Sequence, residues 1–355
     1  MNKKIVILGG GYGGLTVAHQ LLDKELPDTT ELILVDRLPY QGLKTEYYAL
    51  AAGTVAEINI RAGFPEHPQL SKCYGEIAEI DPEAKEVRFQ DRDPLNYDQL
   101  VVALGCVDKF HNIPGAELYS SSIQSLSATR KTFQKVNDVK PYGTVSIVGG
   151  GLSGVEMAAE LRESRPDLNV RILDRGTSIL SAFPGRLQSF VRTWFERHDI
   201  EILNQVSVTR LEEGVIYNQG DMLYTDTTVW TAGIQPSPVV QQLDVPKDSQ
   251  GRVLLNEYHQ IPRYPDIYVV GDCASMGFSP SAQAAEGQGK QVAEIIQALH
   301  KGETPQLTQI KLKGVLGSLG KKSGFALMGK RTVMLGKVPR ILKSGVLWMS
   351  KHHFG

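Results

Sequence analysis

The stretch KIVILGGGYGG at residues 4–14 decides the fold, because it joins a strand-forming run to a glycine-rich turn. Residues 15–22 then place apolar side chains at helical spacing, and residues 32–36 read LILVD. This order of strand, glycine turn, helix, strand and acid is typical of a βαβ unit in a parallel sheet.

A second copy of the pattern starts at residue 145. Residues 145–148 read VSIV, residues 149–154 read GGGLSG, and a helical pattern leads to VRILD at 170–174. We therefore expect an α/β fold with two Rossmann-like dinucleotide-binding domains.

The remaining strand-like runs show how the two units share the chain. Apolar runs at 100–104, 227–231 and 267–270, and a helical pattern at 283–299, favour a second domain nested within the first. The expected ranges are 1–110 for the first part of the outer domain, 111–262 for the nested domain, 263–303 for the second part of the outer domain, and 304–355 for a basic C-terminal region.

Composition excludes several classes of protein. Of 355 residues, 41% are hydrophobic and 22% charged, which is ordinary for a globular protein of two domains. The three cysteines, Cys73, Cys106 and Cys273, form no CxxC pair, so neither a disulfide framework nor a metal site is expected. No run of 18 apolar residues occurs, and the expected location is the cytoplasm or the inner face of the cell membrane. No nucleic-acid partner is expected.

Each glycine turn has the spacing GxGxxG. Its first glycine allows the sharp turn, the second lets the backbone approach a pyrophosphate, and the third lets the helix pack on the strand. The start of the helix then offers free N–H groups and a positive dipole end to that pyrophosphate.

An acid ends each unit. Asp36 lies 22 positions after Gly14 and Asp174 lies 20 positions after Gly154, where a carboxylate can accept hydrogen bonds from ribose hydroxyls. Asp174 would also repel a 2′-phosphate, which favours NADH over NADPH. Arg175 beside it could accommodate that phosphate, so NADPH stays open as the alternative.

With both glycine turns, the segments VVALG (101–105), TAG (231–233) and YVVGD (268–272) carry a family resemblance over about residues 3–336. The chain resembles the flavoproteins with two dinucleotide-binding domains, and among them the type II NADH dehydrogenases, in a shorter dehydrogenase-like branch. The resemblance implies FAD at the first turn and NADH at the second. It implies a hydride passing from NADH to FAD, then two electrons passing to a quinone, without proton pumping.

The resemblance also assigns roles to residues. FAD would be bound by Gly9, Gly11, Gly13, Gly14, Asp36, Lys44, Ile77, Ala103, Gly105, Asp272 and Ala284. NADH would be bound by Gly149, Gly151, Gly154, Asp174 and Gly233. Glu156, Gln283 and Gln288 would act in catalysis.

Three residues also have simpler structural interpretations. Glu156 could be an acid of the first helical turn, favoured by the helix dipole. Lys44 could be a solvated surface lysine. Cys273 reads best as a small buried residue.

Residues 282–288, AQAAEGQ, depart from the family's AQxAxQQ pattern at Glu286 and Gly287. The positive end of this helix could still stabilise a reduced flavin. An ionised glutamate would not favour an apolar quinone headgroup. Two alternatives therefore stay open: reduction of a soluble acceptor, such as a ferredoxin-like protein or free flavin, and a weakly active NADH-responsive binding protein.

Cysteine positions argue against neighbouring activities. Disulfide reductases need a cysteine pair beside the flavin, peroxide-reducing relatives need a cysteine soon after Asp36, and sulfide–quinone reductases need two or three placed cysteines. Residues 38–52 contain none.

The C-terminal region is strongly basic. From Thr304 onward there is no acid and there are ten Lys or Arg, a charge of +10. The formal net charge of the whole chain is −1, so the rest of the chain carries −11. Apolar residues between 338 and 353 recur at helical spacing, with charge supplied by Lys337, Arg340, Lys343 and Lys351. This pattern favours a helix on an anionic membrane surface. The alternative is packing against the acidic body or a second copy in a homodimer.

Overall fold

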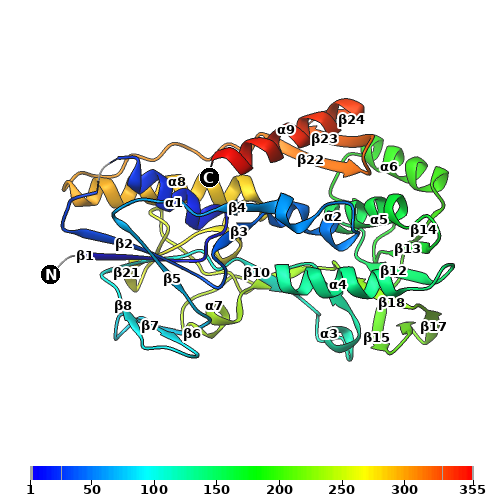
Figure 1. Cartoon of the computed structure of the whole chain (residues 1–355), viewed down its shortest axis with the longest axis horizontal. Coiled ribbons are helices and arrows are strands. Elements are labelled where there is room, and N and C mark those ends of the chain that lie inside the picture. The colour runs from blue at the N-terminus through cyan, green and yellow to red at the C-terminus, as the bar shows by residue number, and fades with distance from the viewer. Residues whose placement is uncertain (1–2, 25, 330, 354–355) are drawn as a thin grey trace.

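The computed structural model describes residues 3–24, 26–329 and 331–353. Residues 1–2 and 354–355, at the ends of the predicted outer ranges, lie outside the described residues. Two parallel sheets lie side by side along the long axis of the molecule, and a small C-terminal sheet and helix cover one side (Figure 1). The expected α/β class is confirmed.

The first sheet contains six strands. Their order is β20 (Gln260–Ile261), β21 (Tyr264–Val269), β9 (Gln99–Val102), β1 (Lys3–Leu8), β2 (Thr30–Asp36) and β5 (Leu70–Tyr74). All neighbours pair in parallel except β20 and β21. Residues 5–8 of β1 are fully buried, as expected for a strand with both faces covered.

The second sheet takes its strands from the part of the chain between β9 and β20. Their order is β11 (Ser121–Ser122), β18 (Thr227–Trp230), β12 (Thr144–Val148), β13 (Asn169–Leu173) and β14 (Ile200–Leu203), all parallel. The predicted boundary at residue 262 falls between the paired strands β20 and β21. Both predicted βαβ units are therefore present, one in each sheet.

Helices cover the sheets. α1 (Tyr12–Leu22) packs closely against α8 (Ala282–His300) on one face of the first sheet (Figure 1). α5 (Leu152–Ser164) packs on the second sheet. The other helices are α2 (Tyr47–Ala51), α3 (Ala116–Tyr119), α4 (Leu126–Asp138), α6 (Gly185–Arg197) and α7 (Pro238–Gln242). The side chain of Ser281 accepts the Ala284 N–H and so caps α8.

A two-stranded ribbon connects the two sheets. β10 (Cys106–Asp108) follows β9, β19 (Ile234–Pro236) follows β18, and the two strands pair antiparallel. Smaller sheets lie outside the two large ones. One pairs β3 (Tyr40–Gly42) with β4 (Arg61–Gly63), and another contains β6 (Ile77–Asp81), β7 (Glu86–Phe89) and β8 (Leu95–Asn96). A further one contains β15 (Val208–Glu212), β16 (Val215–Asn218) and β17 (Asp221–Tyr224).

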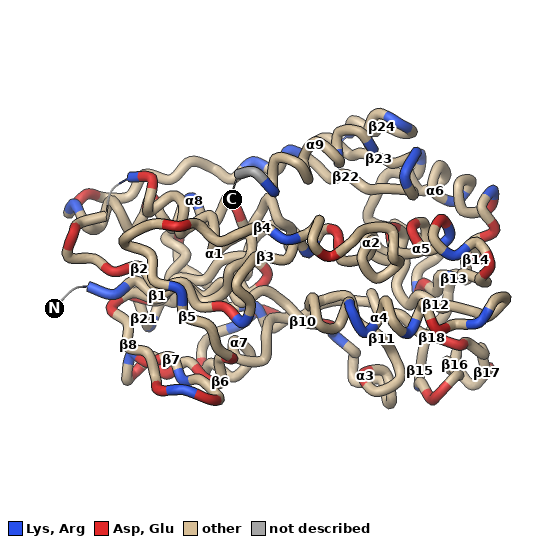
Figure 2. Tube along the Cα trace, in the orientation of Figure 1, with Lys and Arg blue, Asp and Glu red and all other residues tan. Residues whose placement is uncertain are grey.

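The C-terminal region forms an antiparallel sheet of β22 (Gly314–Leu319), β23 (Ser323–Met328) and β24 (Thr332–Gly336), followed by α9 (Lys337–His353). β22 packs on α5, and α9 lies over the small sheet. Lys and Arg are the only charged residues along this region (Figure 2). Across the described part of the chain, no helix has the length and apolar character needed to span a membrane.

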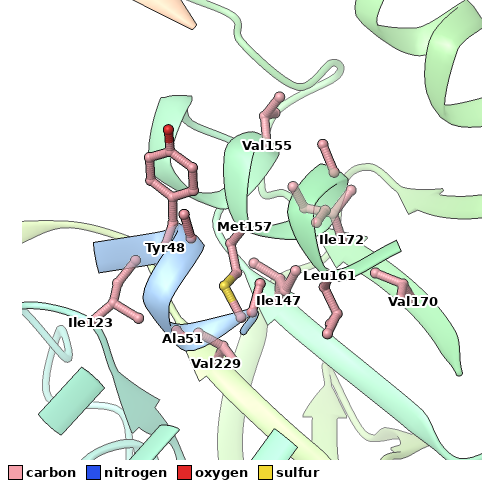
Figure 3. Packing of buried hydrophobic residues seen from close by; sticks show 14 of the residues in the cluster. Tyr48, Ala51, Ile123, Ile147, Val155, Met157, Leu161, Val170, Ile172 and Val229 are labelled. Atoms are coloured by element: carbon pink, nitrogen blue, oxygen red, sulfur yellow. The ribbon is translucent and has the colours of Figure 1, made fainter. Parts of the chain in front are cut away.

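The short helix α2 lies between the two halves of the molecule. It packs on α4 and α5, and its buried residues join the apolar core of the second sheet. Tyr48 is almost fully buried, with its hydroxyl directed away from the apolar side chains around Met157 (Figure 3). A buried hydroxyl needs a polar partner, so this end of α2 marks a polar site beside the core.

Candidate functional site

The first glycine turn is built from close backbone contacts. A Cβ on Gly14 would lie 1.9 Å from the carbonyl oxygen of Gly9, and a Cβ on Gly9 would lie 2.5 Å from that of Ala103. A Cβ on Gly13 would press on Val270 at 2.9 Å. A Cβ on Gly11 would meet no atom within 4 Å, so the start of α1 faces open space.

The second turn repeats this geometry. A Cβ on Gly154 would lie 2.0 Å from the carbonyl oxygen of Gly149, while one on Gly151 would meet nothing within 4 Å. Gly149 itself has φ +115° and lies against Thr231. In both turns two glycines are required by packing, and the middle glycine leaves room beside free helix N–H groups.

The carboxylates that end the two βαβ units accept hydrogen bonds from the backbone of their own glycine turns. Asp36 accepts hydrogen bonds from Gly10 N at 2.7 Å and Leu38 N at 2.9 Å. Asp174 accepts from Gly150 N at 2.7 Å and from Gly176 N at 2.6 Å. A carboxylate can accept about four hydrogen bonds, so each keeps capacity for the predicted ribose contact.

The ribbon brings the two turns to one place. Ala103 lies against the first turn and leads through Gly105 into β10, while Thr231 lies against the second turn and leads through Gly233 into β19. Lys109 N donates to the Gly233 carbonyl at 3.0 Å, which closes the end of the ribbon. Each turn therefore lies beside a segment that leads into this pair of strands.

Lys44 and Asp272 meet at Cys106. Lys44 Nζ lies 3.1 Å from Cys106 Sγ, and that thiol donates to Asp272 Oδ2 at 2.9 Å. Lys44 is half-buried and is not a solvated surface lysine. Burial raises the pKa of both the Cys106 and the Cys273 thiols to about 12. They stay protonated and cannot act as thiolate nucleophiles near neutral pH.

The two predicted glutamines near the beginning of α8 have different hydrogen-bond partners. Gln288 Oε1 accepts from Gly271 N at 2.7 Å, beside Asp272, while its buried Nε2 has no hydrogen-bond partner in the described structure. Gln283 instead holds the C-terminal region, bonding both Lys313 N and the Gly314 carbonyl at 2.9 Å. The two glutamines therefore serve different neighbours, and their catalytic roles stay predictions.

Two further predicted contacts lie near these turns. Gly75 N donates to the Asp36 carbonyl at 3.1 Å, which holds the segment before Ile77 at the end of β2. Ala284 lies in the first turn of α8, where Ser281 caps its N–H. Their predicted FAD contacts stay predictions.

Glu156 lies in a buried polar cluster that we call the carboxylate cluster: Glu46, Tyr48, Glu156, Ser318 and Lys343. Glu156 Oε1 accepts from Ser318 N at 2.8 Å and pairs with Lys343 Nζ. Lys343 also donates to the Tyr48 hydroxyl at 2.6 Å and lies 3.9 Å from Glu46 Oε1. The plain first-turn reading of Glu156 is insufficient, because the side chain crosses to another part of the chain.

The orientation of α9 corrects the sequence interpretation of the tail. Arg340 and Lys343 face inward, where Arg340 Nε donates to the Gly320 carbonyl and Lys343 enters the carboxylate cluster. The outward face is apolar, with exposed fractions between 43% and 69%, and consists of Val338, Ile341, Leu342, Val346, Trp348 and Met349. These two basic residues complement buried acids and carbonyls, so they are unavailable to an external surface.

Two Rossmann-like sheets, two glycine turns and a connecting ribbon define a flavoprotein oxidoreductase with two dinucleotide-binding domains. Residues 3–289 match the family described as pyridine nucleotide-disulphide oxidoreductase. The chain belongs to this family, although its cysteines provide no disulfide site.

Two related proteins and one solved structure show which members of the family are similar to this chain. The chain is 54% identical over 355 residues to the "NADH dehydrogenase-like protein YutJ" of Bacillus subtilis, covering 99% of this chain and 100% of that protein. It is 27% identical to a "Type II NADH:quinone oxidoreductase" of Staphylococcus epidermidis, over 95% and 94% of the two chains. Its fold is similar to that of NDH2 from Plasmodium falciparum, solved with NADH, with a TM-score of 0.85, 16% identity, and 100% and 97% coverage. The predicted resemblance to type II NADH dehydrogenases is confirmed.

Proposed function

We propose that the chain is an FAD-dependent NADH dehydrogenase that passes two electrons to a quinone. The observation that carries this proposal is the shared ribbon, because Ala103 against the first turn leads into β10 and Thr231 against the second leads into β19. Two ligands held at these turns can extend toward one another, which direct hydride transfer requires. The names of the relatives, NADH dehydrogenase-like and NADH:quinone oxidoreductase, agree with this chemistry.

The residues present fit FAD at the first turn and NADH at the second. Open space beside Gly11 and Gly151 matches the room that a pyrophosphate needs, and Gln288 Nε2 is a buried donor awaiting an acceptor. When bound, FAD supplies the acceptance of hydride and the onward passage of electrons. The chain supplies two helix N-termini and the carboxylates of Asp36 and Asp174.

The carboxylate cluster supplies proton handling. Reduction of a quinone takes two electrons and two protons, so a buried acid that reaches the acceptor has a direct use. Glu156 is held by Ser318 and Lys343, which orients the carboxylate and balances its charge. No coupled proton pumping is proposed.

The departure at Gly287 has a packing reason. A Cβ at Gly287 would lie 2.7 Å from Cγ2 of Ile310, where the segment after α8 lies against the helix. The glycine therefore makes room for this chain's own C-terminal segment. This contact accounts for Gly287 alone, so reduction of a soluble acceptor stays the alternative to the quinone.

The experiment is an anaerobic titration of the purified yellow protein. NADH should bleach the flavin absorption, and menadione should then restore it. Loss of colour on addition of NADH without recovery by menadione would favour another acceptor. A spectrum unchanged by bound NADH would contradict the enzymatic function.

We also propose that α9 attaches the protein to an anionic membrane surface. Its exposed apolar face is suited to shallow insertion. Lysines elsewhere in the basic C-terminal region remain on the surface to attract anionic lipid. Flotation with anionic vesicles should recover the wild type, and the double variant Ile341→Ser, Met349→Ser should stay at the bottom of the gradient. If light scattering instead shows a dimer that this double variant dissociates, a second copy covers the face.

A further inference from the structure

Glu46 lies in a three-residue turn whose side chains face three different sites. Lys44 contacts Cys106 beside Asp272, and Thr45 Oγ1 lies 3.0 Å from the hydroxyl of Tyr12 at the start of α1. Glu46 faces Lys343 and Tyr48. The turn therefore connects the first glycine turn directly to the carboxylate cluster.

The surroundings of Glu46 hold more acid than base. Glu156 and Glu160 approach it from α5, Lys343 and Arg340 approach it from α9, and the Tyr48 hydroxyl lies 3.5 Å from its Oε1. Lys343 is already paired with Glu156, so a second ionised carboxylate at 3.9 Å is only partly balanced. Burial, with Glu156 adding to it against Lys343, raises the pKa of Glu46 to about 7.

The overall reaction leaves one proton to be supplied. NADH gives a hydride, which is two electrons and one proton, whereas a quinol carries two electrons and two protons more than the quinone. One proton must therefore come from the protein or from water. A carboxylic acid beside an ion pair can give that proton, because the remaining carboxylate is stabilised by the lysine.

We infer that Glu46 is the residue that holds this second proton, with Lys343, itself paired to Glu156, as the positive charge that stabilises Glu46 when it ionises in each transfer. The O–H bond of Glu46 breaks, the proton passes to the reduced acceptor oxygen, and the carboxylate regains a proton from water. The side chain is 11% exposed, which leaves it contact with solvent. This inference rests on the proposed function for the identity of the acceptor.

The test compares Glu46→Gln with Glu160→Gln, which removes another buried carboxyl on α5. The first readout is an infrared difference spectrum of the resting protein between about pH 5 and pH 9, a range that brackets neutral titration of a raised carboxyl. The wild type and Glu160→Gln should show a protonated carboxyl that ionises near neutrality. That band should be absent in Glu46→Gln, and its persistence there would overturn the inference.

The second readout separates the two half-reactions. In Glu46→Gln, bleaching of the flavin by NADH should keep the wild-type rate, while reoxidation by menadione should slow on the order of 100-fold and lose its pH dependence. A wild-type pH profile of reoxidation in this variant would overturn the inference. Failure of NADH to bleach the wild-type flavin would instead refute the proposed function, and the infrared result would still stand by itself.

Discussion

The helices of the two βαβ units, α1 and α5, each follow a glycine turn of the same type. Different parts of the chain pack over these two helices. α1 is covered by α8 so closely that a Cβ on Gly289 would lie 2.6 Å from the Gly13 carbonyl. α5 is covered by the C-terminal sheet, where Glu163 accepts the Lys321 N–H at 2.9 Å. Both covers include apolar packing, but only the second adds bonds from the C-terminal region to carboxylates of the covered helix.

The difference is sharpest two positions after the last glycine of each turn. Thr16 donates to the Tyr12 carbonyl at 2.7 Å, within its own helix. Glu156, at the matching position, reaches Ser318 and Lys343 in the C-terminal region. A duplicated unit thus keeps its turn and acid, while the helix surface is free to acquire a separate role.

The largest expected effect, complete loss of a bound cofactor, comes from filling the open space at the first turn, with the second turn as its comparison. Gly11→Ala and Gly151→Ala add a Cβ that meets no protein atom, so both variants should fold. Gly11→Ala should be purified without colour, whereas Gly151→Ala should stay yellow but bind NADH about tenfold more weakly or worse, a loss of about 1.4 kcal/mol or more. Absorption spectra and NADH titration measure both outcomes. Equal colour and equal affinity in the two variants would show that the turns are equivalent or empty.

The second test separates the matching positions Thr16 and Glu156. Lys343→Met leaves Glu156 buried beside an apolar side chain, which should cost about 3–5 kcal/mol. Hydrogen exchange of the β22 amides should show this loss as easier opening of the C-terminal sheet. Thr16→Ala should cost only about 1 kcal/mol, because it removes one bond within a helix. Similar losses in both variants would contradict the contrast.

The third test uses pH. The pKa of Glu46 is raised by burial from 4.5 to about 7, so the folded protein retains a proton that the unfolded chain releases. The corresponding stability is fully present below about pH 4.5 and is lost as the pH rises through 7, by about 3 kcal/mol in all. Glu46→Gln should remove this slope and be more stable than the wild type at about pH 8, as measured by thermal unfolding across pH.

Glu57 provides a control of opposite sign. Its hydrogen bond from Arg130, which outweighs burial, lowers the pKa of Glu57 to about 2. Stability from this pair is present above about pH 4.5 and is lost as the pH falls through 2. Glu57→Gln should therefore destabilise the protein at pH 7 and have no effect at about pH 2. A Glu46→Gln curve parallel to that of Glu57→Gln would contradict the assigned protonation.

The smallest expected effect concerns the coenzyme. Asp174→Asn removes the charge that would repel a 2′-phosphate and keeps a side-chain oxygen for the turn. With Arg175 adjacent, the ratio of kcat/KM for NADPH to that for NADH should rise about tenfold. Asp36→Asn, the matching change in the first unit, should leave this ratio unchanged. A ratio altered equally by both variants would show that the two turns do not divide the dinucleotides as proposed.

The sequence predicted the regular parts of the molecule well, because their signals are local. Both βαβ units, the helix beginning at Ala282 and the tail helix appear within three residues of their predicted positions. The carboxylate cluster could not be predicted, since its members come from four distant segments of the chain, one of which holds both Glu46 and Tyr48. Glu46, directly before the apolar run at residues 47–52, was the one available signal. Lys343 was assigned to the wrong face of α9, because a helical stripe alone does not reveal which side packs on protein.

The order in which the cluster's residues are synthesised has a consequence for folding. Tyr48 and Lys343 are 295 positions apart. At roughly 5–20 residues per second on the ribosome, Lys343 emerges about 15–60 seconds after Tyr48. Glu46 and Glu156 must therefore remain hydrated in the nascent chain, because no counter-ion has yet been made for them. The two glycine turns can form during translation, but the carboxylate cluster can lose its water only after α9 has docked.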